Sequence, residues 1–239
     1  CRFGATCTGT GAAHLNGLAP TDDTVSLIYH GLDLGRFPEP PAERPHRDGV
    51  AEAVELVSVG RLVAKKGYDD LMQALGALPD ELNWCLVHIG GGPLKDELRA
   101  QAEALGIADR IEWRGKRDQT EVIEALRSAD LFVLPSKIAG DGDRDGLPNV
   151  LMEAASQKLP ILSTAVSAIP EFIEDGVHGR LTPPGEPVAF SEALSEMISN
   201  VTKRTCYADA AYDRLRQEFG MCGGIDVLEV LLRGALGRG

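Results

Sequence analysis

The stretch VELVSVGRLVAKKGYDDLMQALGAL at residues 54–78 decides the fold class, because its hydrophobic period changes part-way along. Apolar and β-branched residues at 54–59 lead into a glycine-containing loop, and apolar residues at helical spacing follow at 68–78. The first run predicts a buried strand and the second an amphipathic helix. The stretch therefore predicts a strand–loop–helix unit of the kind that builds parallel sheets.

The same alternation continues along the chain. The expected strands are 54–59, 84–89, 110–113, 131–134 and 160–163, preceded by one at 25–29. The expected helices are 68–78, 94–105, 121–128, 149–157, 189–200, 207–218 and 225–236. This order predicts an α/β fold with a Rossmann-like parallel sheet and helices on both faces. Ligands of such folds bind beyond the carboxyl ends of the strands. The Pro-rich stretch 37–49 is expected to be an exposed connector.

Composition narrows the functional classes. The chain has 239 residues, of which 44% are hydrophobic, enough for one or two globular domains. Its 24 Lys and Arg against 36 Asp and Glu give a net charge of -12, which argues against nucleic acid or anionic lipid as a broad partner. The five scattered cysteines form no C-x-x-C pair. With no apolar run long enough to span a membrane, we expect a cytoplasmic protein. Because the chain begins at Cys1 and not Met, we also expect a piece of something longer.

Two cations follow the first central strand. Gly60 and Arg61 end the strand, and Lys66 precedes the next helix. A guanidinium grips phosphate oxygens bidentately and an ammonium adds a point charge, so the pair suits a diphosphate. The alternative is a solvated loop in which Lys65 and Lys66 face water. The second loop, IGGGPL at 89–94, lets backbone approach a ligand, but it lacks the spacing of a dinucleotide or P-loop motif and also fits a plain tight turn.

The acidic loop GDGDRDGLPNVLMEA at 140–154 opens like a calcium loop. The expected bidentate glutamate position holds Met152, however, and the hydrophobic eighth position holds Pro148, so we expect no metal site. Pro148 and Asn149 instead predict a helix start whose N–H groups face the ligand crevice. The free groups would be those of Asn149, Val150 and Leu151.

Two acids flank this helix start. Glu153 lies one turn into the helix on the face of Asn149, where its carboxylate could accept hydrogen bonds from the paired hydroxyls of a ribose. Asp145 lies eight residues earlier, at the mouth of the same site. The alternative for Glu153 is a first-turn acid that complements the helix dipole.

Taken in order, these motifs resemble the donor-binding half of family 4 retaining glycosyltransferases with the GT-B fold. The matching runs are HGLDLGRF (30–37), VSVGRL (57–62) with KKG (65–67), IGGGPL (89–94), ADLFVLPS (129–136), DGLPNVLMEAAS (145–156) and LPILSTAVSAIPEFIEDGVHGRLTPPGEP (159–187). The resemblance covers about 25–200. It implies domains at 1–20 (remnant of an acceptor-side domain, or linker), 21–200 (nucleotide-sugar donor domain) and 201–239 (C-terminal helices).

The resemblance also implies roles for single residues. Arg61 and Lys66 would hold the donor diphosphate and stabilise the leaving nucleotide. Asp145 and Glu153 would be the E-x7-E pair, the first acid meeting sugar hydroxyls and the second the ribose. The donor-binding set would be Gly60, Arg61, Lys66, Gly146, Leu147, Pro148, Asn149, Val150 and Glu153, with residues 113–116 beside the base. No metal or further cofactor is implied, because the cations and the helix start would neutralise the charge.

Three departures from the family pattern stand out. The first acid of the pair is Asp145 in place of glutamate, and Ser167-Ala168 replaces a frequent Gly-Gly. The resemblance also leads us to expect that the family's N-terminal acceptor domain is missing here, apart from at most a last helix at about 6–18.

The expected function is therefore donor binding within a metal-independent retaining enzyme. That enzyme would move a hexose from a UDP- or GDP-sugar to a polysaccharide or lipid-linked acceptor, and this chain alone would be inactive. The missing domain could add peripheral contact with the inner face of the plasma membrane. Two alternatives stay open: a degenerate, non-catalytic sugar-nucleotide-binding module, and a GT-B-like nucleotide-sugar epimerase. The epimerase would need acid and base groups in the cleft, and His30, His88 and His178 are read as structural or solvated.

Overall fold

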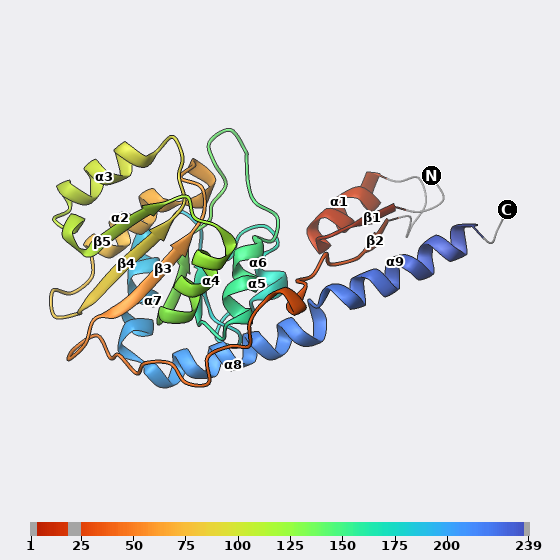
Figure 1. Cartoon of the computed structure of the whole chain (residues 1–239). Helices are drawn as coiled ribbons and strands as arrows, with labels where there is room; N and C mark the ends of the chain where they lie inside the picture. Colours follow the sequence, from red (N-terminus) through yellow and green to blue (C-terminus); the bar gives the residue numbers. More distant parts are fainter. Residues whose placement is uncertain (1–3, 19–24, 237–239) are drawn as a thin grey trace.

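The computed structural model describes residues 4–18 and 25–236, and its main body is a sheet of six parallel strands (Figure 1). The strands are β3 (Val54–Val59), β4 (Trp84–Ile89), β5 (Ile111–Gly115), β6 (Leu131–Leu134), β7 (Ile161–Thr164) and β8 (Arg180–Thr182). Their order is β5-β4-β3-β6-β7-β8, and Val57 of β3 pairs with Val87 of β4 and Phe132 of β6. This is the doubly wound order, in which the chain first builds outward to one edge and then to the other. The expected α/β fold class is confirmed.

Helices flank the sheet on both faces. They are α2 (Tyr68–Gly76), α3 (Lys95–Ala104), α4 (Gln119–Ser128), α5 (Asn149–Ser156), α6 (Ile169–Phe172), α7 (Pro187–Ser199) and α8 (Val201–Glu218). Helix α2 packs against α3 and α7, whereas α5 packs against α4 and α8. Because parallel crossovers are right-handed, the helices that leave β3 and β4 lie on one face and those that leave β5 and β6 on the other.

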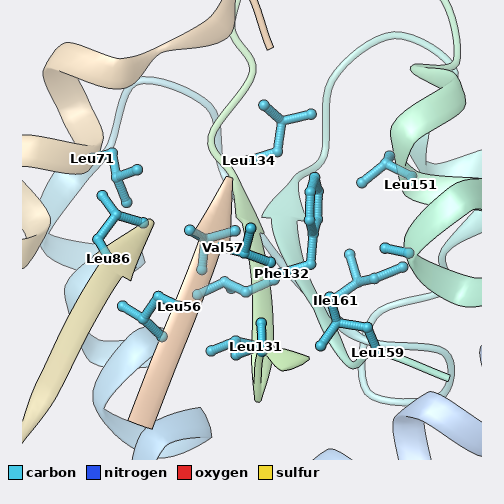
Figure 2. Packing of buried hydrophobic residues seen from close by; sticks show 14 of the residues in the cluster. Leu56, Val57, Leu71, Leu86, Leu131, Phe132, Leu134, Leu151, Leu159 and Ile161 are labelled. Carbon is cyan, nitrogen blue, oxygen red and sulfur yellow. The ribbon is translucent and has the colours of Figure 1, made fainter. Parts of the chain in front are cut away.

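The core lies where β3 and β6 meet these helices. All four side chains of β6 are 0% exposed, as are Leu56 and Val57 of β3. Figure 2 shows Phe132 of β6 between the sheet and Leu151 of α5. A strand that is covered on both faces has a continuous run of apolar residues. The sequence therefore predicted the first and last residues of β3 and β6 correctly.

The remaining boundaries differ from expectation for local reasons. Strand β5 begins one residue late, because Arg110 ends a 3-10 turn (Ala108–Arg110) and donates from Nη2 to the carbonyl of Leu82 at 2.8 Å. Helix α8 begins six residues early at Val201, because Asn200 caps it by accepting the Lys203 N–H at 2.9 Å. The three-residue strand β8 was not expected from its sequence.

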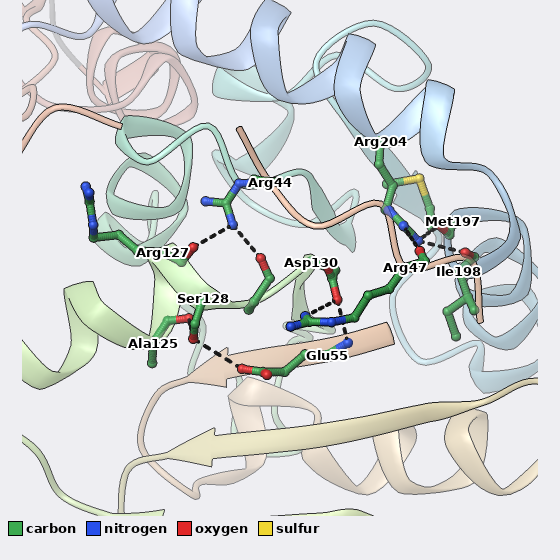
Figure 3. Close-up of polar contacts among 11 residues, drawn as sticks. Arg44, Arg47, Glu55, Ala125, Arg127, Ser128, Asp130, Met197, Ile198 and Arg204 are labelled. Atoms are coloured by element: carbon green, nitrogen blue, oxygen red, sulfur yellow. Dashed lines mark hydrogen bonds and ion pairs between the residues drawn. The ribbon is translucent and has the colours of Figure 1, made fainter. Parts of the chain in front are cut away.

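The connector at 37–49 is not simply exposed, and that expectation is corrected. The largely buried Arg44 donates to carbonyls at the carboxyl ends of two helices, and burial lowers its pKa to about 10. The acceptors are the carbonyls of Leu126, Arg127 and Ala129 at the end of α4 and of Gln157 and Lys158 after α5. Figure 3 shows this contact beside the ion pair of Arg47 with Asp130, 2.7 Å long. Cations are favourable at helix carboxyl ends. Through Arg44 the connector therefore holds the ends of α4 and α5 together.

A smaller unit precedes the main body. Strand β1 (Gly4–Thr6), helix α1 (Gly9–Leu18) and strand β2 (Val25–Leu27) form a two-stranded parallel sheet with one helix, separate from the six-stranded sheet (Figure 1). The last helix of the described chain is α9 (Met221–Leu236). The chain then runs along the α8–α9 junction, where the Leu32 N–H donates to the Phe219 carbonyl at 2.8 Å. The domain boundary expected at 20/21 lies outside the described residues. No helix in the described part of the chain is long and apolar enough to span a membrane.

Candidate functional site

The loops that carry the candidate residues meet at the carboxyl ends of β3 and β6. These neighbouring strands are the point where the sheet order reverses, since the chain proceeds outward from them in opposite directions. In doubly wound folds, ligands bind beyond the carboxyl ends of the strands at such a switch point. The loop after β3 supplies residues 60–67 and the loop after β6 supplies 135–148.

The glycines of the second loop serve to pack two loops together. A Cβ atom at Gly90 would lie 1.8 Å from the carbonyl oxygen of Gly60, and one at Gly92 would lie 2.3 Å from that of Leu62. The Leu62 N–H also donates to the Gly91 carbonyl at 3.1 Å. The glycines are therefore needed because two backbones approach each other closely, which agrees with the tight-turn alternative. The same contact holds the start of the loop at 60–67, which carries Arg61 and Lys66.

Another backbone approach joins the loops after β3 and β6. Gly67 has φ 67°, and a Cβ atom there would lie 1.9 Å from the Pro135 carbonyl oxygen. The Lys137 N–H donates to the Lys65 carbonyl at 2.8 Å. The sequence run KKG thus ends in a glycine because no other residue fits against Pro135, and this contact brings the lysines up to the acidic loop.

Lys66 and Asp145, predicted from separate motifs, form an ion pair. Lys66 Nζ lies 2.7 Å from Asp145 Oδ2, and the two side chains are only 13% and 17% exposed. Lys65 Nζ lies 3.1 Å from Asp143 and 3.5 Å from Asp145. Lys65 is therefore part of the cluster, in contrast to the solvated-loop alternative.

Arg61 is at the strand end as expected, but the structure does not join it to this cluster. Its side chain is exposed. Across residues 4–18 and 25–236 no carboxylate lies within ion-pair distance of it. A guanidinium that carries its charge unpaired beside a crevice is available to an anion.

Helix α5 begins at Asn149 as predicted, with one correction. The Leu151 N–H donates to the Pro148 carbonyl at 3.1 Å, so it is not free as expected. Leu147 and Pro148 are buried, so their side chains belong to the core rather than to the crevice. Asn149 is exposed and Val150 half-buried, so the helix start still offers the N–H groups of these two residues.

Glu153 is a half-buried carboxylate one turn along α5. No described residue donates a hydrogen bond to its side chain or pairs with it. Burial accordingly raises its pKa above the ordinary glutamate value. A desolvated carboxylate without a partner is costly for the fold, as is common for residues kept for binding.

Three residues that the sequence analysis did not assign to the donor site contact it or the segments next to it. His30 Nε2 lies 2.6 Å from Asn149 Oδ1, so the histidine read as structural or solvated contacts the start of α5. Thr8 lies over the acidic loop, with its methyl carbon 3.7 Å from where a Cβ of Gly146 would be. Glu171 contacts the start of α1. All three contacts join distant segments, and no local pattern could have indicated them.

Residues 113–116, predicted to border the base of the donor, lie beside the glycine loop. Lys116 Cγ lies 3.6 Å from where a Cβ of Gly91 would be. The Trp113 ring lies 5.4 Å from that of His88, which also contacts Tyr68 edge-on at 4.6 Å. Burial lowers the pKa of His88 to about 4, so it is a neutral support beneath the loops.

The chain is similar in sequence to known proteins. A family model described as "Glycosyl transferases group 1" matches residues 46–214, which include the ion pair, the start of α5 and Glu153. The chain belongs to this family. The chain is 31% identical over 201 residues to a putative colanic acid biosynthesis glycosyltransferase, WcaL, of Escherichia coli K12, covering 81% of this chain and 48% of the relative. It is 33% identical over 175 residues to the amylovoran biosynthesis glycosyltransferase AmsK of Erwinia amylovora, covering 72% and 43%.

Solved structures show the same fold. The Anabaena protein Alr3699/HepE, crystallised with UDP and glucose, superposes with a TM-score of 0.81 at 20% identity, covering 98% of this chain and 64% of that one. A glycosyltransferase of Rickettsia africae superposes at 0.83 with 15% identity, covering 98% and 64%. The group 1 glycosyl transferase chain spans about half the length of the curated relatives it matches.

Proposed function

We propose that the chain is the donor-binding part of a retaining, metal-independent glycosyltransferase that binds a nucleoside diphosphate hexose. The observation that carries the proposal is the meeting of Lys66, Asp145 and the start of α5 at the switch point of the sheet. Cations and helix N–H groups at this edge suit the phosphates of a nucleotide. The UDP bound to the Anabaena structure supports the same chemistry for this fold.

Each part of the donor has a candidate partner. The diphosphate would replace Asp145 as the partner of the Lys66 ammonium. It would also bind the unpaired guanidinium of Arg61 as a second cation. The ribose would donate its hydroxyls to Glu153, which has no donor of its own among the described residues. Asp145, once displaced, would accept hydrogen bonds from the sugar. The backbone at Gly60 and from Gly146 to Val150 would line the remainder.

The same residues would lower the barrier to transfer. As the glycosyl bond breaks, negative charge accumulates on the leaving diphosphate. Arg61 and Lys66 would stabilise this charge more strongly in the transition state than in the ground state, which is the requirement for catalysis. The proposal therefore assigns neutralisation to side chains and the helix start, with no metal ion.

The acceptor and the cellular setting are inferred from the relatives. WcaL and AmsK are named for colanic acid and amylovoran biosynthesis, so we propose a polysaccharide or lipid-linked saccharide as acceptor. The part of the relatives that this chain does not span would bind it. We place the protein in the cytoplasm, with any peripheral membrane contact made by that part.

Calorimetric titration tests the proposal. UDP, GDP and ADP and their hexose conjugates are titrated into the chain in EDTA, alongside an Arg61→Ala/Lys66→Ala variant and a control with Lys203 and Arg233 replaced by Ala on remote helices. We expect saturable binding of one nucleotide family, lost in the first variant and kept in the control. Equal binding by all three proteins, or binding that requires an added divalent cation, would contradict the proposal.

A further inference from the structure

The unit of β1, α1 and β2 has little stability of its own. Each of its strands has three residues, and α1, described from Gly9 to Leu18, has no buried residue. A two-stranded sheet with one exposed helix is marginal in water because it buries too little apolar surface. Its position must therefore be set by contacts with the rest of the chain.

Glu171 of α6 makes the most extensive of these contacts. Its Oε2 accepts the Gly9 N–H at 2.6 Å and the Tyr29 hydroxyl at 3.1 Å. Its Oε1 accepts the N–H of Thr10 at 3.0 Å and the hydroxyl of the same residue at 2.9 Å. Burial raises the pKa of Glu171, but these four hydrogen bonds outweigh it and hold the pKa below the ordinary value.

The carboxylate does for α1 what an N-cap residue does for other helices. The first turn of α1 contains no acidic residue. Glu171, more than 160 positions away in the sequence, satisfies two N–H groups that the helix leaves unpaired and complements the positive end of its dipole. Because the cap comes from another element, it also fixes where the helix start can lie.

The backbone of Glu171 is itself held in place. Arg214 of α8 donates from Nη2 to the Glu171 carbonyl at 3.1 Å and from Nη1 contacts His178 at 3.2 Å. The capping carboxylate is therefore carried by a rigid part of the main body.

The capped helix start lies beside the donor site. Thr8, directly before α1, lies over Gly146 of the acidic loop. We propose that Glu171 is a positioning residue that seats the β1–α1 loop over Gly146 and so sets the affinity for the donor. This inference rests on the proposed function, because it assigns Thr8 and Glu171 to the wall of the same nucleotide-sugar site.

Two readouts on the whole chain test it, with Glu171→Gln, Glu171→Asp and a control, Glu229→Gln. Glu229 is an exposed glutamate of α9 that pairs with Arg233 and makes no hydrogen bond to α1 within the described residues. Glutamine keeps one oxygen but replaces the other with an NH2 group that would face N–H or hydroxyl donors, so half of the acceptors of the cap are lost with little change of volume. Hydrogen exchange of the α1 amides is measured without nucleotide, and donor affinity by titration.

We expect Glu171→Gln to speed exchange of the Gly9 and Thr10 amides by about tenfold, in line with loss of a helix cap. Donor affinity should fall several-fold, exchange in β3 and β6 should stay unchanged, and Glu171→Asp should restore part of both effects. Unchanged hydrogen exchange of the α1 amides in Glu171→Gln would show that Glu171 does not anchor the start of α1. Faster exchange with unchanged affinity would overturn the positioning role while the proposed function stands. Absence of nucleotide binding by the wild-type chain would overturn the proposed function and the positioning role together, and exchange would then decide the anchor alone.

Discussion

Lys66 Nζ lies 2.7 Å from Asp145 Oδ2 at the carboxyl edge of the sheet. The two residues come from loops more than 70 positions apart, which the close approach of Gly67 to Pro135 brings together. The ammonium that would hold a phosphate is thus already neutralised by an acid. Nucleotide binding must exchange one anion for another, and this sets the sign of several effects.

Replacing Asp145 should affect binding of the diphosphate and binding of the sugar in different ways. Asp145→Asn removes the anion that competes for Lys66, so affinity for the nucleoside diphosphate should rise by about threefold, the scale of a partly exposed ion pair. Affinity for the nucleotide sugar should rise less or fall, because the sugar loses its acceptor. Calorimetry on both ligands measures the difference. The control is Asp143→Asn, which removes one of the two acids near Lys65 and leaves the Lys66–Asp145 pair intact. Weaker binding of the diphosphate by Asp145→Asn would contradict the exchange.

Glu153 should trade stability for binding. Its pKa is raised by burial, so the folded state holds the proton more tightly than the unfolded chain. The folded state is therefore penalised at pH values above the raised pKa, and the penalty disappears as the pH falls through it. Glu153→Gln should raise the melting temperature at pH 7 while weakening nucleotide binding about tenfold, as expected for loss of a charged acceptor. Glu124→Gln on α4 should change neither quantity, and a lower melting temperature for Glu153→Gln would refute the assignment.

His88 should make stability depend on pH. Its pKa falls from 6.5 to about 4 through burial, so the unfolded state binds the proton first. Stability is intact above pH 6.5 and is lost as the pH falls toward 4, by about 3 kcal/mol at most for this group. Urea unfolding at pH 7, 6 and 5 should show a shallower pH dependence for His88→Leu than for wild type. The exposed His46, replaced by Gln, should leave the slope unchanged, and equal slopes for wild type and His88→Leu would be the opposing result.

Arg44 should be important for stability but not for binding. Arg44→Ala leaves five helix-end carbonyls without their donor and should lower the free energy of unfolding by about 3 kcal/mol. Arg44→Lys should restore part of this loss. Denaturant titration measures both, and nucleotide affinity in the folded variants should match wild type because Arg44 lies at the opposite end of the strands. A loss below about 0.5 kcal/mol, typical of an exposed residue, would show that the connector does not hold the ends of α4 and α5 together.

The sequence predicted the centre of the sheet well because both faces of β3 and β6 are covered. Continuous apolar runs then mark each strand clearly, and parallel order places the following loops at one edge. Together with the resemblance of the motifs, this is how Lys66 and Asp145 were assigned to one donor site. The three-residue strands β1 and β8 have too few residues for a period to appear.

The parts that the sequence did not predict depend on contacts between distant segments. In the sequence, Arg44 looks like any charged residue of a Pro-rich connector. Its role follows only from the fold, which brings the ends of α4 and α5 next to it. Glu171 reads as an ordinary acid of a short helix, and its contact with the start of α1 follows only from the packed fold. The Leu151 N–H was expected to be free, but the tight turn at Pro148 pairs it.

A crystal structure of the chain with the nucleoside diphosphate that binds in solution would show directly which residues hold the donor. We expect the diphosphate to lie between Lys66 and the first turn of α5, with the ammonium moved from Asp145 to a phosphate oxygen and the ribose hydroxyls on Glu153. A nucleotide bound anywhere else, or one that leaves the Lys66–Asp145 pair intact, would contradict this expectation.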